Sequence, residues 1–250
     1  MLKNPTNQLL ILPGWDGTKK TWQDFINIAR KDYEVICLEL PCFGNEPCPD
    51  KIWGVKEYAD FVAQKIKSLN LIKPILLGHS FGGQVAAYLA ANNPELISQL
   101  ILSGPTLSRP KHNLKRFIFG FMASFGKIFF QLFPFDKLGK GNFSFKTKAK
   151  KILYRLADSP DYNNTSGIKR EIFKKIIRQD VTDQLSKIDL PVLIIWGGKD
   201  NYVSLKAGKK LAKLIKNSKL KIIPNGRHGL HISQPDDFYK IIRDCGPMPY

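Results

Sequence analysis

A serine flanked by two glycines stands between a predicted strand and a predicted helix. Residues 78–82 read Gly-His-Ser-Phe-Gly; they follow the apolar run 75–77 and precede a helix-like run over 83–91. A sharp strand-to-helix turn strains the backbone and pushes the serine side chain outward. A Cβ at either flanking position would clash with the neighbouring strand and helix, which is why glycine is needed there. The pattern predicts Ser80 as a nucleophile.

Such a serine needs a histidine as its base and a carboxylate that fixes the tautomer of the histidine. Asp200 follows the apolar run 191–196, so it is predicted to lie in the loop at the carboxyl end of a strand. Open α/β sheets place their chemistry at these strand ends. The tripeptide Lys-Asp-Asn at 199–201 is also typical of a turn, so Asp200 could be a turn residue. Its position directly after a predicted strand favours the acid role.

The base must be one of four histidines, which are His79, His112, His228 and His231. His228 lies in the loop after the apolar run 220–223, and the order Ser80, Asp200, His228 is the one expected for strand-turn-helix nucleophiles. His231 is the rival base, although we expect it to pack at the start of the last helix, which Ser233 would cap. His79 is predicted to point away from the serine, and His112 to lie on the surface.

The rest of the chain alternates between predicted strands and helices. The predicted strands are 9–12, 35–38, 75–77, 100–102, 191–196 and 220–223. The predicted helices are 22–30, 55–69, 83–91, 204–215 and 235–243. This alternation predicts an α/β protein with a mostly parallel sheet and helices on both faces. The pattern breaks over 105–190, so we expect a core of residues 1–104 and 191–250 with an insertion between them.

Together with residues 78–82, four further segments resemble the α/β-hydrolase-fold family over nearly the whole chain. They read Leu-Pro-Gly-Trp at 12–15, Leu-Glu-Leu-Pro-Cys-Phe-Gly at 38–44, Trp-Gly-Gly-Lys-Asp at 196–200, and the run from Gly226 through His228 to Phe238. The chain departs from the family at Pro13, where a histidine is usual, and at Glu39 and Cys42, where aspartate and glycine are usual. Pro13 removes a side chain that often helps to orient the oxyanion loop.

The resemblance implies a serine esterase that works through an acyl-enzyme, with Ser80, Asp200 and His228 as the catalytic triad. It also implies an oxyanion hole formed by the backbone N–H groups of Trp15 and Phe81, and no metal or organic cofactor. The insertion 105–190 would be a helical lid over the active site. A serine nucleophile argues against the dehalogenases and epoxide hydrolases of the same fold, which use aspartate.

The predicted lid is strongly basic and rich in phenylalanine. Residues 105–180 hold 17 Lys and Arg against 5 Asp and Glu, which is a net charge of +12 out of +18 for the whole chain. Several apolar residues recur at helical spacing, among them the predicted pocket-lining residues Phe117, Phe121, Phe125 and Phe129. One interpretation is an apolar stripe that packs on the core, with lysines on a solvated face. The other is recognition of a ligand that is both oily and anionic.

Two partners fit the second interpretation: an acyl chain on an acidic acyl carrier protein, or an anionic membrane surface. Within the family, a small hydrolase with a basic lid is similar to pimeloyl-ACP methyl ester carboxylesterases. A general carboxylesterase or monoacylglycerol-type lipase and a non-catalytic binding protein are the alternatives. No nucleic-acid motif accompanies the basic composition, so no nucleic-acid partner is expected.

The first residues and the cysteines bear on location. Residues 1–8 lack a basic segment followed by an apolar stretch and a cleavage site, so we expect a cytoplasmic protein, with peripheral membrane contact as the alternative. The four cysteines lack metal-ligand spacing, and they are Cys37, Cys42, Cys48 and Cys245. Cys42 and Cys48 could be bridged if their loop allowed it, but reduced thiols are the expectation for a cytoplasm.

Overall fold

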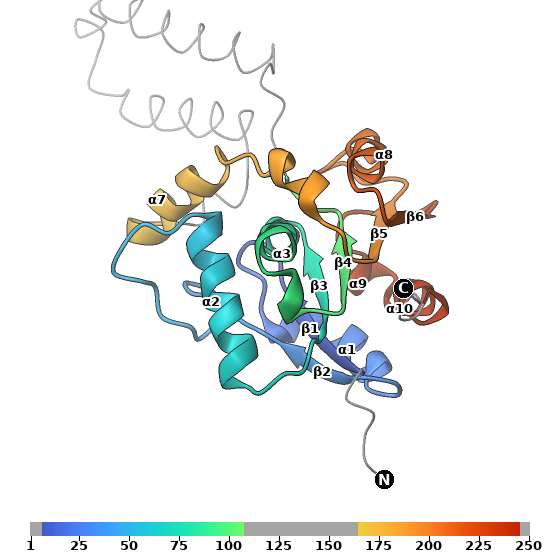
Figure 1. Ribbon diagram of the computed structural model, residues 1–250, viewed down its shortest axis with the longest axis horizontal. Coiled ribbons are helices and arrows are strands. Elements are labelled where there is room, and N and C mark those ends of the chain that lie inside the picture. The colour runs from blue at the N-terminus through green and yellow to red at the C-terminus, as the bar shows by residue number, and fades with distance from the viewer. Residues whose placement is uncertain (1–6, 108–164, 246–250) are drawn as a thin grey trace, which may run out of the picture. The chain divides into compact units, whose positions relative to one another are not determined.

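The computed structural model describes residues 7–107 and 165–245, and in them a single parallel sheet organises the chain (Figure 1). The strands lie in the order β2-β1-β3-β4-β5-β6, and every neighbouring pair is parallel. Their bounds are β1 Gln8–Leu12, β2 Glu34–Cys37, β3 Ile75–His79, β4 Gln99–Ser103, β5 Val192–Gly197 and β6 Ser218–Ile223. The six predicted strands and the predicted parallel α/β fold are confirmed.

Helices connect the strands. The α-helices are α1 Gln23–Ala29, α2 Val55–Ser68, α3 Phe81–Asn92, α7 Gly167–Ile176, α8 Leu205–Leu214, α9 Leu230–Ser233 and α10 Pro235–Asp244. Shorter 3-10 turns are η1 Lys19–Trp22, η2 Pro94–Leu96 and η4 Thr182–Lys187. The five predicted helices correspond to α1, α2, α3, α8 and α10. α7 and α9 have no counterpart among the predicted helices.

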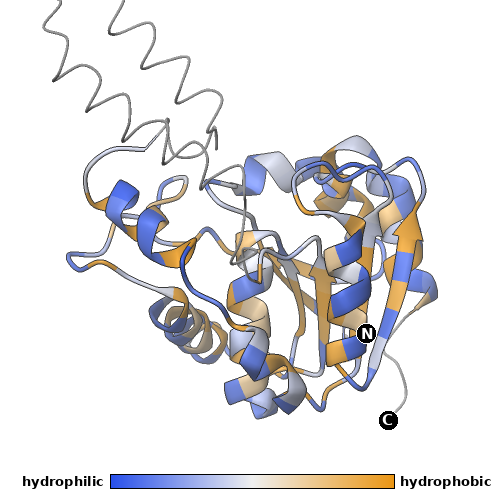
Figure 2. Ribbon diagram, turned by 90° about the horizontal axis from the view of Figure 1, so that it is seen from above, coloured by the Kyte–Doolittle hydropathy of each residue, from blue (hydrophilic) through white to orange (hydrophobic). Residues whose placement is uncertain are grey.

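Alternate strand residues face opposite sides of the sheet, and both sides are covered. Leu9, Leu77 and Leu193 belong to one cluster with residues of α1 and α10. On the other side Gly78 lies against α3, and Trp196 lies against α8. The four inner strands β1, β3, β4 and β5 are therefore buried along almost their whole length, as expected for a parallel sheet between two helical layers, whereas the edge strands β2 and β6 are partly exposed. Figure 2 shows this pattern, with hydrophobic inner strands, an edge strand of mixed hydropathy and hydrophilic outer faces on the helices.

The chain divides into two compact units, residues 1–109 with 167–250, and residues 110–166. The first unit includes 167–190, which the sequence analysis placed in the insertion. The turn after α7 is held on α2, because the side chain of Gln179 accepts a hydrogen bond of 2.8 Å from the backbone of Val55. The lid over 105–190 stays a prediction, and its last part belongs to the same unit as the sheet. None of the described helices is both long and apolar enough to cross a bilayer.

The expectation of reduced thiols is wrong for one pair, because Cys42 and Cys48 form a disulfide. The intervening loop turns back on itself: the backbone N–H of Cys42 donates to the carbonyl of Pro47, and Cys42 adopts a φ of 72°. This turn brings the two Cα atoms to 4.1 Å, which spacing along the sequence could not predict. Disulfides persist mainly in oxidising compartments. The cytoplasmic location stays a prediction, and this bond does not favour it.

Replacing Gly208 by alanine should destabilise the protein, although alanine is the better helix former. A Cβ at Gly208 in α8 would lie 2.6 Å from the indole of Trp196. That indole is 1% exposed and donates a hydrogen bond to the carbonyl of Val203, so it cannot move aside. We expect the free energy of unfolding to fall by about 2 kcal/mol in urea denaturation. The matched control is Gly229→Ala, whose Cβ would meet nothing closer than 3.7 Å; equal stabilities of the two variants would contradict this packing.

Candidate active site

The turn between β3 and α3 holds Ser80 in a conformation that side chains rarely adopt. Its φ is 52° and its ψ is −115°, and the residue is 8% exposed. Its backbone N–H donates to the carbonyl of Ser103 at the end of β4 (3.0 Å), and its own carbonyl accepts from Gln84 and Thr106. The surrounding backbone therefore fixes a strained residue, as the sequence pattern predicts.

Both flanking glycines are required by close approach. A Cβ at Gly78 would lie 2.6 Å from the carbonyl oxygen of Gly82 and 2.7 Å from the Cβ of Ala86 in α3. A Cβ at Gly82 would collide with the carbonyl oxygens of Leu12 and Pro13 at the end of β1. The helix and the strand thus meet at this turn with no room for side chains, which confirms the reason given for the two glycines.

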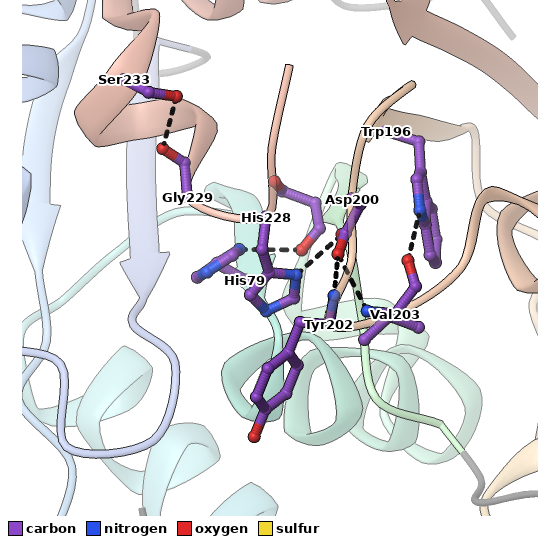
Figure 3. A network of polar contacts seen from close by, with 9 residues as sticks. His79, Trp196, Asp200, Tyr202, Val203, His228, Gly229 and Ser233 are labelled. Carbon is purple, nitrogen blue, oxygen red and sulfur yellow. Dashed lines mark hydrogen bonds and ion pairs between the residues drawn. The ribbon is translucent and has the colours of Figure 1, made fainter. Parts of the chain in front are cut away.

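Asp200 and His228 are joined by a hydrogen bond at the ends of β5 and β6 (Figure 3). The Oδ2 atom of Asp200 lies 2.8 Å from Nδ1 of His228. The other carboxylate oxygen accepts two hydrogen bonds of 2.8 Å from the backbone N–H groups of Tyr202 and Val203. The carboxylate side chain is 1% exposed and the imidazole 19%. A buried carboxylate whose two oxygens are engaged holds the ring in one orientation and places the proton on Nδ1.

The second ring nitrogen, Nε2 of His228, is buried and has no hydrogen-bond partner among the described residues. The hydroxyl of Ser80 therefore does not bond to it in this structure. The two residues are nevertheless close to the same peptide. The backbone N–H of Ser80 donates to the carbonyl of Ser103. The next residue, Gly104, lies against the His228 ring, because a Cβ added to Gly104 would be 3.2 Å from Cε1 and Nδ1 of that ring. Catalytic hydrogen bonds are often long or unformed without substrate.

The segment 13–17 passes beside Ser80. A Cβ at Gly14 would lie 3.2 Å from the Cβ of Ser80, and the N–H of Gly17 donates to the carbonyl of Gly14 across a tight turn. Within the described residues, the backbone N–H groups of Trp15 and Phe81 donate to no protein acceptor. An oxyanion hole requires two such unused N–H donors beside the nucleophile.

Two further histidines pack behind His228. The rings of His79 and His228 have centroids 4.8 Å apart, and those of His79 and His231 are also 4.8 Å apart. His79 bonds through Nδ1 to the carbonyl of Ser103 (3.0 Å). His231 stacks on the indole of Trp22 at 3.8 Å. The carboxylate of Asp200 bonds to His228 and not to His231, which favours His228 over His231 as the base.

Burial sets the protonation of these two rings. It lowers the pKa of His231 to about 3, with a further contribution from the neighbouring His228. Burial also lowers the pKa of His79 well below its usual range, and the nearby His231 and His228 add to the effect. Both rings are therefore neutral near pH 7, and neither competes with His228 for a proton.

The expected cap on the last helix is a wrong prediction. The hydroxyl of Ser233 donates back to the carbonyl of Gly229 (3.1 Å), one turn earlier in α9. The residue at the N-cap of α10 is Gln234, and its side chain makes no capping hydrogen bond. The short helix α9 separates the histidine loop from α10, and the sequence pattern did not indicate this break.

Sequence reasoning missed Tyr202, whose ring lies beside the imidazole of His228 with centroids 4.8 Å apart (Figure 3). Tyr202 is 48% exposed as a residue, and it borders His228 on the side that solvent reaches. An aromatic residue two positions after the candidate acid is the only signal in the sequence. The predicted pocket residues Phe117, Phe121, Phe125 and Phe129 lie outside the described residues, and their role stays a prediction.

Known proteins share this fold. The family model described as alpha/beta hydrolase fold matches residues 7–235. A pimeloyl-[acyl-carrier protein] methyl ester esterase of Neisseria meningitidis is 24% identical over 97% of this chain and 94% of its own length. The uncharacterized hydrolase YugF of Bacillus subtilis is 28% identical over 97% of this chain and 91% of its own. A crystal structure of a bacterial membrane phospholipase A is 22% identical, with a TM-score of 0.71, over 96% of this chain and 78% of that one.

Replacing His231 by phenylalanine should make stability less sensitive to acid. Below pH 6.5 an unfolded His231 takes up a proton, whereas the folded residue stays neutral down to a pKa of about 3. The free energy of unfolding therefore falls on acidification through this window, by up to about 1.4 kcal/mol per pH unit for one histidine. His231→Phe keeps a ring on Trp22 and removes this loss.

Urea denaturation between pH 4.5 and 8 measures the effect, with Ser233→Ala as the control. The profile of His231→Phe should be shallower below pH 6.5 and parallel to that of the wild type above pH 7. Parallel profiles at all pH values would show that the folded His231 titrates normally.

Proposed function

Because the chain belongs to the α/β-hydrolase fold family, we propose that it is a serine hydrolase that cleaves carboxylic esters through an acyl-enzyme. One observation carries the proposal. A buried Asp200 holds His228 by Nδ1, which leaves a buried Nε2 without a partner among the described residues, and the same ring lies against Gly104, next to the Ser103 carbonyl that accepts from the Ser80 N–H. This arrangement supplies a positioned base beside a strained, glycine-flanked serine.

In the first step Nε2 of His228 removes the proton of Ser80 as Oγ attacks the ester carbonyl. This step requires the Ser80 hydroxyl to reach Nε2 when substrate is bound. The new Oγ–C bond places the former π-electron pair on the carbonyl oxygen. Asp200, at 2.8 Å, stabilises the imidazolium that forms, without accepting the proton itself.

The unused N–H groups of Trp15 and Phe81 bind the oxyanion. Such a donor typically lowers the barrier by about 3 kcal/mol, because it is already aimed at the position where charge develops. Collapse of the intermediate breaks the bond to the alcohol oxygen, which receives its proton from His228. Water, deprotonated by the same nitrogen, then attacks the acyl-enzyme and releases the acid and Ser80.

For the substrate, we propose an acyl chain carried as an ester on an acidic carrier protein. Relatives named pimeloyl-[acyl-carrier protein] methyl ester esterase align over nearly the whole chain, at 24% and 26% identity. The net charge of +12 over residues 105–180 gives a basic segment suited to an acidic partner. A general esterase at an anionic membrane and a binding protein without turnover are the other outcomes of the tests below.

Ser80→Ala should reduce hydrolysis of p-nitrophenyl butyrate by at least about 10³-fold, because the nucleophile is lost. Asp200→Asn should lower kcat by about 10⁴-fold, since the amide favours the wrong histidine tautomer. Ser233→Ala, which changes an exposed hydroxyl of α9, should keep wild-type rates. Labelling with a fluorophosphonate and mapping of the modified residue should identify Ser80. Residual hydrolysis of the same rate in Ser80→Ala would instead favour a binding role.

The carrier proposal predicts a preference between two forms of one ester. A methyl ester on acyl carrier protein should be hydrolysed with a kcat/KM at least about tenfold higher than the free methyl ester in low salt. This advantage should shrink at 0.5 M NaCl, where the Debye length falls below about 5 Å. Equal kcat/KM values for both forms, together with activation by anionic vesicles, would support the membrane esterase instead.

A further inference from the structure

The oxyanion segment 13–17 is supported by α7, a helix distant from it in sequence. Nζ of Lys169 lies 2.5 Å from Oδ1 of Asp16, the residue that follows Trp15. One turn further along α7, the ring of Phe173 packs on the Trp15 indole with centroids 4.8 Å apart. Residues i and i+4 share one helix face, so a single face of α7 contacts two consecutive residues of the segment.

The Lys169 side chain is largely enclosed by its surroundings. It is 20% exposed, and its ammonium lies 5.4 Å from the centroid of the Phe43 ring. Phe43 is fully buried and packs edge-on against Trp15, at 4.9 Å. The ammonium thus lies between a carboxylate and an aromatic face, and both attract a cation.

The segment itself needs such support. Pro13 has no side-chain donor with which to fix it, and Asp16 adopts a left-handed φ of 56°. An aspartate tolerates this region, but at a cost in conformational energy. A change of φ at Asp16 would reorient the segment 13–17, whose backbone also carries the N–H of Trp15.

The helix offers a fixed support because its other end is attached to α2. Nζ of Lys175 donates to the carbonyl of Ile52 (3.0 Å) and lies 3.7 Å from the carboxylate of Glu57. Beyond the helix, Gln179 bonds the backbone at the start of α2. Movement of α7 would therefore break contacts at both ends.

We propose that Lys169 is a positioning residue for ester hydrolysis. Its ion pair with Asp16 holds the segment 13–17 so that the backbone N–H of Trp15 points to the oxyanion. The inference rests on the proposed serine-esterase function. It adds that α7, which follows the predicted pocket residues in the sequence, controls the geometry of the oxyanion hole. Lys169 touches no reacting atom, so its effect falls on the transition state through the loop.

Lys169→Met keeps an unbranched chain over Phe43 and removes the charge. We expect kcat for p-nitrophenyl butyrate to fall about fivefold with KM nearly unchanged, as for the loss of one partly exposed ion pair. Asp16→Asn should show the same loss, and the double variant should be no worse than either single one, because both remove one interaction. Lys169→Arg should restore most of kcat.

The matched control is Lys174→Met on the same helix. Lys174 pairs with Glu171 at 2.7 Å, on α7 itself, so its loss should leave kcat unchanged. A trifluoromethyl ketone, which forms a tetrahedral adduct with serine, should bind Lys169→Met more weakly by the same factor as kcat falls. Hydrogen exchange of the Trp15 amide should be faster in Lys169→Met and unchanged in Lys174→Met.

The outcomes separate the two proposals. A wild-type kcat and unaltered Trp15 exchange in Lys169→Met, with activity still dependent on Ser80, would overturn the positioning role and leave the esterase intact. Equal losses in Lys169→Met and Lys174→Met would also overturn it, since they would indicate a general effect on α7. A wild type without Ser80-dependent hydrolysis would overturn the esterase proposal first and the role of Lys169 with it.

Discussion

The left-handed turn at Ser80 is the constraint on which the rest of the site depends. It exists because β1, β3 and α3 approach so closely that neither Gly78 nor Gly82 has room for a Cβ. The same contact places the end of β1, and with it the segment 13–17, directly beside the serine. The hydrogen bond from the Ser80 N–H to Ser103 brings in the end of β4. One strained residue thus aligns three strand ends.

Electrostatics then distinguishes one imidazole among three that are in contact. Among the described residues, His228 is the only one of the three with a carboxylate partner, and that carboxylate is buried with both oxygens hydrogen-bonded. His79 and His231 lie in surroundings that hold their pKa values far below the ordinary one, so they remain neutral. A proton taken from the serine is therefore stabilised at a single position. The neutral His79 ring packs against His228, and His231 packs against His79, so these contacts restrict the orientation of His228.

Much of the core could be predicted because parallel strands covered on both faces are continuous apolar runs, which are easy to recognise. The runs 75–77 and 191–196 correspond to β3 and β5, each of which is followed by a candidate catalytic residue. Prediction failed where backbone path matters more than composition. The Cys42–Cys48 disulfide depends on a loop that reverses direction. The break between α9 and α10 depends on the short helix α9, which begins directly after Gly229 in the histidine loop.

By itself the sequence determined the order of strands and helices, the two obligatory glycines and the identity of Ser80, Asp200 and His228 as candidates, because local residue types suffice for these. Tertiary structure decided which groups meet. It paired Asp200 with His228 and not with His231, and it joined Asp16 to Lys169 across 153 positions. The physical reason is that hydrogen bonds and ion pairs act over a few ångströms, and only the folded sheet brings distant strand ends and α7 to that range.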